Sequence, residues 1–359
     1  MNMNTSALLL YCRAGFEADL GTEIVQKAAD LGIYGYPSFS KQSGFVLFNC
    51  HQVDDAPRLV KSIPLTDLVF ARQMLVCGAP IEFENLEDRI GTILAELDDA
   101  PLFGDVCVEH PDTTEGRALS KLCRKITVPL RQALRKSKQL TSKENLKKPS
   151  LHVFFSSGSN AIIGYSDPSN RSPHPLGILR LKFPSDAPSR STLKLDEAIQ
   201  LFIPQNEMSQ RLAPSMQAVD LGSCPGGWTY QLVKRGLFVH AVDNGAMDAA
   251  LMETGQVTYY AEDGFKFTPR KKQVTWLVCD MIEQPQRVAQ LMANWLAKGW
   301  CKETIFNLKL PMKQRFESVQ QAKQIVDKTL QQHQMRYQWQ AKHLYHDREE
   351  VTVHIRILN

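Results

Sequence analysis

Charged residues end five short apolar runs in the second half of the chain. Four of these runs finish at or beside an acid and the fifth finishes at a lysine; the residues are Asp220, Asp243, Asp263, Asp280 and Lys309. Because the carboxyl ends of parallel strands meet at one edge of a sheet, where ligands bind, these residues are candidates for one shared site. Acids in such positions bind hydroxyl groups, and a lysine can act as a base.

The runs that carry these residues have the properties of strands in a parallel sheet. They cover residues 217–222, 237–243, 257–263, 274–280 and 304–310, and segments with helical spacing separate them. Short apolar runs that alternate with helices predict a doubly wound, mostly parallel sheet. Residues 335–358 contain two strand-like runs with no helix between them, which predicts an antiparallel hairpin at the sheet edge. We therefore expect a Rossmann-like α/β domain with a seven-stranded sheet.

The first half of the chain has a different pattern, which indicates an α+β region. Strands are expected near 7–12, 44–50 and 104–110, a hairpin at 151–167, and helices at 15–32 and 81–97. These elements predict small, partly antiparallel sheets with helices on one face. A proline-containing polar stretch at 182–191 separates this region from the second half.

The turn after the first parallel strand is the most specific signal. Residues 219–229 read VDLGSCPGGWT, a strand end followed by two adjacent glycines. Backbone N–H groups at the start of a helix bind negative groups, and glycines allow close approach. A Walker loop is excluded because Trp228 and Thr229 follow the glycines, and the G-x-G-x-x-G dinucleotide fingerprint is absent. The negative group expected to bind at this turn is therefore better explained as a carboxylate than as a pyrophosphate.

Asp243 indicates the rest of the ligand. It lies about twenty residues beyond the turn, at a strand end where an acid binds the hydroxyls of a ribose. A ligand with both a carboxylate and an adenosine ribose is S-adenosylmethionine (SAM). We expect Gly226 and Gly227 to admit its methionine end. Asp243 is expected to bind its ribose, and Asp263 to face its adenine.

The same residues match a known family. The stretch DLGSCPGGWTYQLVKRG resembles the D-L-G-x-x-P-G-G-W motif of the FtsJ-like ribose 2′-O-methyltransferases. That family carries a Lys-Asp-Lys-Glu tetrad, and matching contexts occur here in the same order: Lys194 in SRSTLKLDEA, Asp280 in LVCDM, Lys309 in FNLKLP and Glu350 in DREEVTV. Glu349 leaves the last assignment open by one residue; Glu350 is favoured because it directly precedes the strand, as in the family.

The resemblance implies a cofactor site, a substrate and a domain order. The implied SAM-binding residues are Ser191, Cys224, Pro225, Gly226, Gly227, Asp243, Asp263 and Asp280. The whole chain is similar to bacterial enzymes that 2′-O-methylate a cytidine of 23S rRNA, which implies a precursor or an incompletely assembled large subunit as substrate. The N-terminal half looks like a ferredoxin-like module (1–98) and a THUMP-like RNA-binding domain (99–182), followed by a linker (183–191) and the methyltransferase domain (192–359).

Ribose methylation gives each tetrad residue a role. A 2′-hydroxyl is a poor nucleophile until its proton is removed, so the reaction needs a base and alignment but no metal. A lysine accepts a proton only while it is neutral, a state that burial and a neighbouring cation favour. We expect Lys309 to be the base and Lys194 to supply the cation. Asp280 and Glu350 are expected to orient the two lysines.

A basic segment in the first half predicts a polyanionic partner, most simply RNA. From Arg117 to Lys148 there are eleven Lys or Arg residues and one acid, Glu144. Apolar residues at helical spacing, from Leu122 to Leu134, indicate that one face packs and the other is cationic. The expected RNA contacts are Arg124, Lys125, Arg131, Arg135, Lys136 and Lys138. The alternative is a solvated basic face without a partner.

Other functions remain as alternatives. Cys224 and Cys279 raise the possibility of a covalent cytosine-C5 methyltransferase mechanism, but the Pro-Cys context of those enzymes is missing, because MIEQ follows Asp280. The same segment also lacks the Asp-Pro-Pro-Tyr type of sequence that amino-group methyltransferases have. His240 and His346 are better explained by packing or solvent roles. The remaining functional hypotheses are a non-catalytic rRNA-binding assembly factor, a methyltransferase for a different RNA such as tRNA, and a Rossmann-type oxidoreductase.

Composition is consistent with these functions. The 359 residues are 43% hydrophobic and 22% charged, the formal net charge is +4, and the eight cysteines are scattered without a C-x-x-C pair. That cysteine usage fits a reducing cytoplasm, and the histidine and cysteine spacing suggests no metal site. No apolar run approaches the length of a membrane helix. We expect a cytoplasmic monomer.

Overall fold

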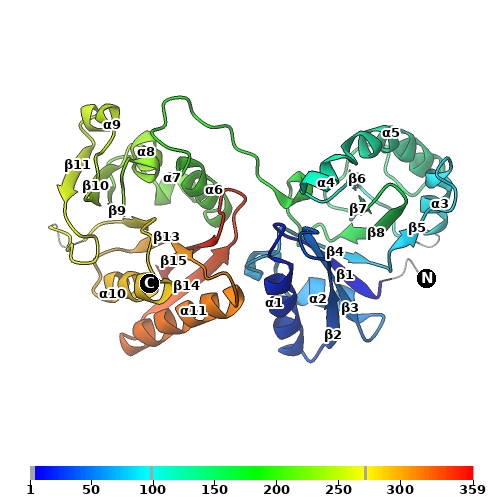
Figure 1. Cartoon of the computed structure of the whole chain (residues 1–359), viewed down its shortest axis with the longest axis horizontal. Helices are drawn as coiled ribbons and strands as arrows, with labels where there is room; N and C mark the ends of the chain where they lie inside the picture. Colours follow the sequence, from blue (N-terminus) through cyan, green and yellow to red (C-terminus); the bar gives the residue numbers. More distant parts are fainter. Residues whose placement is uncertain (1–4, 98–99, 271–272, 359) are drawn as a thin grey trace. The chain divides into compact units, whose positions relative to one another are not determined.

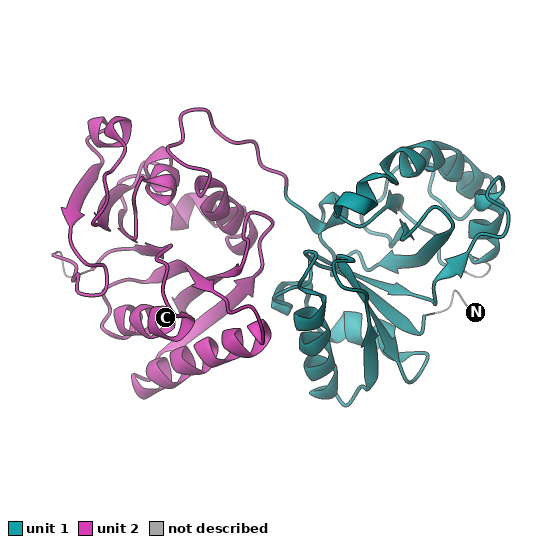
Figure 2. Ribbon diagram, viewed as in Figure 1, with its two compact units in different colours: residues 1–179 teal, residues 180–359 magenta. Residues whose placement is uncertain are grey.

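The chain folds into two compact units in this computed structural model, which describes residues 5–97, 100–270 and 273–358. The first unit ends at Leu179 and the second begins at Arg180 (Figure 2). The boundary expected between residues 98 and 99 lies outside the described residues, and the four-part division of the chain stays a prediction. Asp186, in the expected linker, accepts a hydrogen bond from Tyr230 and so packs on the second unit.

The first unit is built around one sheet. Its elements are β1 (Ala7–Tyr11), α1 (Glu17–Ala29), β2 (Gly35–Ser38), β3 (Phe45–Cys50), α2 (Asp55–Ser62), a 3-10 turn (Leu65–Asp67), β4 (Gln73–Cys77), β5 (Ile81–Glu82), α3 (Arg89–Ala95), β6 (Asp105–Glu109), α4 (Thr114–Arg117), α5 (Ser120–Lys136), β7 (Ser150–Phe155), β8 (Asn160–Ser166) and a second 3-10 turn (Pro175–Gly177). Among the described residues the strand order is β2-β3-β1-β4-β8-β7-β6, with β5 beside β8 (Figure 1).

Two expectations for this unit were wrong. The expected small sheets are one continuous sheet, because β8 pairs with both β4 and β5. The helix expected over 81–97 is limited to α3, and its first residues form β5. Asp88 explains the late start, since its side chain accepts a hydrogen bond from the Gly91 N–H and caps the helix.

The second unit has the predicted seven-stranded, doubly wound sheet. Its elements are α6 (Thr192–Phe202), α7 (Met208–Arg211), β9 (Gln217–Leu221), α8 (Gly227–Lys234), β10 (Phe238–Asp243), α9 (Ala249–Glu253), β11 (Val257–Ala261), β12 (Trp276–Cys279), α10 (Pro285–Ala297), β13 (Glu303–Lys309), α11 (Arg315–Gln332), β14 (Arg336–Lys342) and β15 (Glu350–Leu358). Within the described residues the order is β11-β10-β9-β12-β13-β15-β14. The first five strands are parallel, and β15 and β14 form the predicted antiparallel hairpin.

Helices cover both faces of this sheet. Figure 1 shows α6, α7 and α8 on one side and α10 and α11 on the other. The α6 side is packed by a cluster that includes Leu195, Ile199, Trp228, Trp276 and Ile305. Burying a side chain of this size stabilises the fold by roughly 1.5–3 kcal/mol. This cluster therefore fixes α6 and the start of α8 against the sheet.

Candidate active site

The antiparallel pairing of β13 with β15 places two of the expected catalytic residues side by side. Lys309 ends β13, Glu350 begins β15, and the register puts them directly opposite each other. Side chains in directly opposite positions lie on the same face of a sheet. Accordingly, Lys309 Nζ is 3.8 Å from Glu350 Oε2.

Asp280 joins this pair from the neighbouring strand. It directly follows β12, which runs parallel to β13. Lys309 Nζ donates to Asp280 Oδ1 at 3.0 Å, and the side-chain amide of Asn307 donates to the same oxygen at 2.8 Å. The carboxylate is thus held by two donors from β13.

Lys194 completes the group from the helix above the sheet. It lies in the first turn of α6, donates to Glu350 Oε1, and has its Nζ 3.6 Å from Asp280 Oδ2. Glu349 is outside the cluster, because its half-exposed carboxylate pairs with Arg315 at 2.8 Å. The structure therefore brings together Lys194, Asp280, Lys309 and Glu350, and the residue next to Glu350 points elsewhere.

The two lysines have different surroundings. Burial alone lowers the pKa of Lys194, but the carboxylates of Asp280 and Glu350 outweigh it and hold that pKa above its ordinary value. Lys194 is therefore a stable ammonium group. The Lys309 side chain is 23% exposed, against 15% for Lys194 and 9% for Glu350, so Lys309 is the lysine that faces outward.

The glycine turn owes its shape to packing within the protein. Gly226 has φ +120°, a conformation that only glycine adopts readily, and a Cβ there would lie 2.4 Å from Leu251 Cδ1. A Cβ on Gly227 would lie 2.1 Å from Ser191 Oγ and 2.4 Å from Ser189 Oγ. The segment before α6 therefore packs directly on the glycine turn, which brings the expected cofactor residue Ser191 to it.

Asp243 links this turn to the next strand. Its Oδ2 accepts a hydrogen bond from Cys224 N at 2.9 Å, and its Oδ1 accepts from Asn244 N and Gly245 N. Pro225 is anchored separately, since its carbonyl accepts from Asp248 N. A carboxylate offers about four acceptor positions, so one on Oδ2 remains for a ligand hydroxyl. The Asp243 carboxylate can therefore accept one further hydrogen bond.

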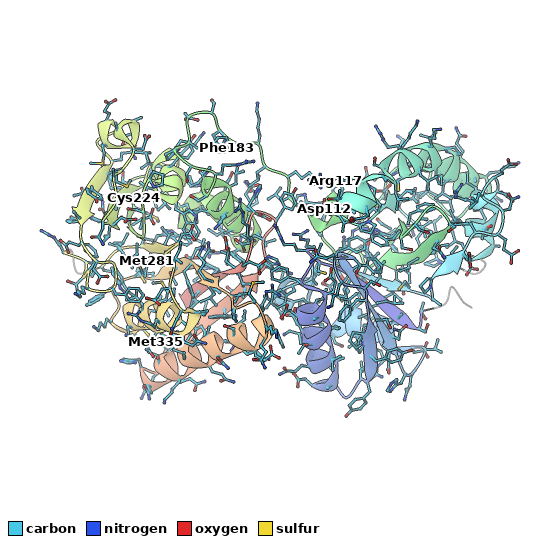
Figure 3. All side chains as sticks on the ribbon, viewed as in Figure 1. Asp112, Arg117, Phe183, Cys224, Met281 and Met335 are labelled. Atoms are coloured by element: carbon cyan, nitrogen blue, oxygen red, sulfur yellow. The ribbon has the colours of Figure 1, made fainter. Side chains whose placement is uncertain are left out.

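Asp263 lies at the same edge of the sheet, shortly after β11. Its Oδ1 accepts a hydrogen bond from Phe265 N at 2.9 Å, and its side chain is half-exposed. A Cβ on the adjacent Gly264 would lie 2.7 Å from Met281 Sδ, so the loop after β11 contacts the loop after β12. Figure 3 labels Cys224 and Met281, which lie in the loops after β9 and β12.

The basic segment forms α5 and the turn after it, in the first unit. Arg124, Lys125, Arg135 and Lys136 are exposed on α5, while Lys138 lies beyond the helix with φ +63°. Arg131 differs, because it donates to Asp105 Oδ1 at 2.6 Å and to the Val106 carbonyl. Its charge is already paired, so Arg131 is the least available of the six expected RNA contacts.

Comparison with known proteins assigns the family. A family model for FtsJ-like methyltransferases matches residues 187–354, and two further models, the RlmM ferredoxin-like domain and the N-terminal domain of ribosomal RNA large subunit methyltransferase M, match residues 5–75 and 88–167. The chain is 61% identical over 353 residues to the ribosomal RNA large subunit methyltransferase M of Pseudoalteromonas atlantica, covering 98% of this chain and 99% of that protein.

The chain belongs to the ribosomal RNA large subunit methyltransferase M family. The protein of that name from Vibrio parahaemolyticus is 54% identical over 98% of this chain and 99% of its own length. Among solved structures, TrmN from Thermus thermophilus is similar over 98% of this chain and 99% of that chain, at 13% identity and a TM-score of 0.36. The protein is a methyltransferase, and SAM is its cofactor.

The two cysteines near the site are poor nucleophiles. Burial raises the pKa of Cys279 to about 12, and burial together with Asp243 raises the pKa of Cys224. A thiol attacks as its thiolate, so neither cysteine suits a covalent cytosine-C5 mechanism. Among the described residues, no cluster of three or more His, Cys, Asp or Glu is arranged to bind a metal, and no helix could span a membrane.

Asp220, one of the strand-end acids expected at the site, is not accessible to a ligand. The residue is fully buried, and Thr229 Oγ1 donates to its Oδ2 at 2.6 Å. Burial raises the pKa of Asp220 to about 7, against the opposing effect of that hydrogen bond. Asp220 thus supports the turn from below and is shielded from ligands.

Several polar residues behind the tetrad were not foreseen. Asn307 and Thr352, paired across β13 and β15, are fully buried and lie two residues from Lys309 and Glu350 along each strand, on the same face. Glu197 of α6 accepts hydrogen bonds from Tyr345 N and His346 N, which ties the β14–β15 loop to the helix that carries Lys194. Only the alternation of side chains along β13 could have indicated Asn307.

Proposed function

We propose that this protein transfers the methyl group of SAM to the ribose 2′-oxygen of a cytidine in 23S rRNA, with Lys309 as the general base. The observation that carries the proposal is the meeting of Lys194, Asp280, Lys309 and Glu350 at one edge of the sheet. The target base and the 23S molecule come from the family likeness. We also propose a precursor or incompletely assembled large subunit as the substrate, and a cytoplasmic monomer as the active form.

The charges around the two lysines support this assignment of roles. Lys194 keeps its proton because two carboxylates hold it, so it acts as a fixed cation beside the reacting groups. Asp280 accepts a hydrogen bond from Lys309 Nζ at 3.0 Å and so orients the amine. Lys309 is the more exposed lysine, and its position suits proton exchange with an incoming hydroxyl.

The proposed reaction needs one proton transfer and one bond exchange. The neutral Lys309 amine takes the proton of the 2′-hydroxyl and becomes an ammonium group, while the 2′-oxygen uses the released electron pair to bond to carbon. SAM supplies an electrophilic methyl group, and the electron pair of its carbon–sulfur bond stays on sulfur. Lys194 and Lys309 together then offset the negative charge that develops on the oxygen.

The residues proposed to hold SAM lie around the glycine turn. Backbone groups of Cys224, Pro225, Gly226 and Gly227, with Ser191 packed against them, are proposed to bind the methionine end. Asp243 is proposed to bind the ribose and Asp263 to face the adenine, with Asp280 beside the methyl group. The free acceptor position on Asp243 Oδ2 supports the ribose assignment.

An assembly factor without catalysis, or a methyltransferase for another RNA, is the competing proposal. A factor that only binds RNA has no need of two lysines and two carboxylates held in one partly buried cluster, because partly buried charges cost desolvation energy. The tetrad therefore favours catalysis over binding alone. It does not distinguish rRNA from tRNA, which depends on the N-terminal unit.

We predict that Asp243→Ala weakens SAM binding by about 1–3 kcal/mol, because hydrogen bonds from the ribose hydroxyls to a charged acceptor are lost. Isothermal titration calorimetry measures the change. Glu253→Ala, which removes an exposed acid on α9, is the matched control and should bind SAM as wild type does. Unchanged affinity in folded Asp243→Ala protein would remove this acid from the cofactor site.

We predict that Lys309→Arg lowers kcat by about 10²–10⁴-fold, the usual effect of removing a positioned base. The guanidinium keeps the positive charge but cannot release a proton near neutral pH. SAM affinity should change little, because Lys309 acts on the hydroxyl. The measurement is single-turnover methylation of RNA that lacks the modification, beside SAM calorimetry.

Lys313→Arg is the control for this variant, since Lys313 is exposed four residues further along the chain. It should methylate RNA at the wild-type rate. If Lys309→Arg does the same, Lys309 only positions the substrate and another group takes the proton.

We predict that the variant Arg124→Ala/Lys125→Ala/Lys136→Ala binds rRNA more weakly and with a salt dependence flatter by roughly 2 in the slope of log K against log salt. Each phosphate contact contributes about 0.7–0.9 to that slope. Filter binding across a series of salt concentrations measures it, and SAM affinity should be unchanged.

The control removes three charges from the same unit at positions away from α5: Lys27, Lys41 and Lys61. Its salt slope should stay close to wild type, because those lysines lie outside the proposed RNA surface. Equal slopes for both triple variants would mean that α5 is an ordinary solvated basic face.

A further inference from the structure

A fully buried acid lies behind the tetrad and has no role in the proposed reaction. Asp347 belongs to the loop between β14 and β15 and has no exposed surface. Its carboxyl oxygens lie 3.1 and 3.0 Å from Thr352 Oγ1, and its Oδ2 accepts a hydrogen bond from Leu344 N at 3.0 Å. Burying a carboxylate is costly, so the protonation state of Asp347 needs an explanation.

A hydrogen-bond chain leads from this acid to the tetrad. Thr352 Oγ1 is 2.7 Å from Asn307 Oδ1, and Asn307 Nδ2 is 2.8 Å from Asp280 Oδ1. Asn307 and Thr352 are directly opposite each other on β13 and β15, and both are fully buried. Asp347 therefore reaches the Asp280 carboxylate through two side chains.

Counting protons along the chain assigns the state of Asp347. The Asn307 amide must turn its Nδ2 toward the Asp280 carboxylate, because its oxygen would be repelled there, and its Oδ1 is then an acceptor facing Thr352. Thr352 has one hydroxyl proton, which it donates to Asn307. The short contact between Thr352 and Asp347 then needs a proton from Asp347.

The surroundings of Asp347 agree with this count. Burial raises the pKa of Asp347 well above its ordinary value, and Glu350 of β15 raises it further. Lys194 of α6 also acts on Asp347 and favours the carboxylate, whereas Glu197 of α6 opposes it. An ionised Asp347 would also add a third carboxylate to those that act on Lys194.

We propose that Asp347 is a neutral carboxylic acid that donates to Thr352 and, through Thr352 and Asn307, fixes the orientation of Asp280. Asp347 is thus a positioning residue for the proposed base Lys309, and the inference rests on the proposed function of the tetrad. It keeps the cluster at two carboxylates for two lysines.

The first test compares an isosteric and an apolar replacement. The amide of Asp347→Asn donates to Thr352 through Nδ2 and accepts from Leu344 N through Oδ1, so kcat should stay near wild type. Asp347→Leu breaks the chain and should lower kcat by about 10–100-fold, the range for groups that orient catalytic ligands, with SAM affinity unchanged. If Asp347→Asn loses as much kcat as Asp347→Leu, the ionised acid is required and the proposal is wrong.

The second test needs no activity. All five tryptophans, Trp228, Trp276, Trp295, Trp300 and Trp339, lie in the second unit, so their fluorescence follows its unfolding in the full chain. An acid whose pKa is raised on folding contributes stability below the unfolded pKa of about 4 and loses it as pH rises toward the folded pKa. Relative to Asp347→Asn, the wild-type unfolding constant should therefore rise about tenfold per pH unit over that window.

The control is the ratio of the wild-type unfolding constant to that of Glu349→Gln, which removes an exposed paired carboxylate in the same loop; this ratio should show no such rise. If the ratio of the wild-type unfolding constant to that of Asp347→Asn does not increase with pH, Asp347 is not a neutral acid in the folded protein. The two proposals fail separately: an active Lys309→Arg would overturn the base assignment and leave the unfolding result intact.

Discussion

The register between β13 and β15 is the constraint on which the site depends. It sets Lys309 opposite Glu350 and Asn307 opposite Thr352, on the face that α6 covers. A slip of β15 by one residue would turn Glu350 and Thr352 to the other face, away from Lys309 and Asn307. Lys194 reaches Glu350 because α6 is packed on the same face and Glu197 ties it to the β14–β15 loop. The tetrad is therefore a product of strand pairing and helix packing together.

The cofactor edge depends on a second set of packed contacts. Gly227 lacks a side chain because Ser189 and Ser191 occupy that space, and the Asp243 carboxylate holds the backbone of the turn through Cys224 N. The turn is therefore shaped by the protein itself. A ligand that binds there meets backbone groups already in position, which lowers the entropic cost of binding.

The sequence predicted the second unit well and the first unit less well. Short apolar runs that end in charged residues are a strong local signal for parallel strands. They predicted the strand-end positions of Asp280 and Lys309, and the turn after the first of them contains Gly226. The joining of β8 to β4 and β5 is a contact between residues far apart in the chain, which local patterns do not carry. The chain from Asp347 to Asp280 escaped notice for the same reason. Pairing of Arg131 with Asp105 likewise became visible only in three dimensions.

If the tetrad directs the methyl group to a ribose oxygen, as we propose, the transferred methyl must be found on that oxygen. The measurement uses SAM with an isotopically labelled methyl group, the full chain, and 23S rRNA from cells that lack the gene. Mass spectrometry of the digested nucleosides then locates the label. We expect label on the 2′-oxygen of cytidine with the wild-type protein and no label with Lys309→Ala. Label on a base, or equal labelling by Lys309→Ala, would overturn the proposed role of the tetrad.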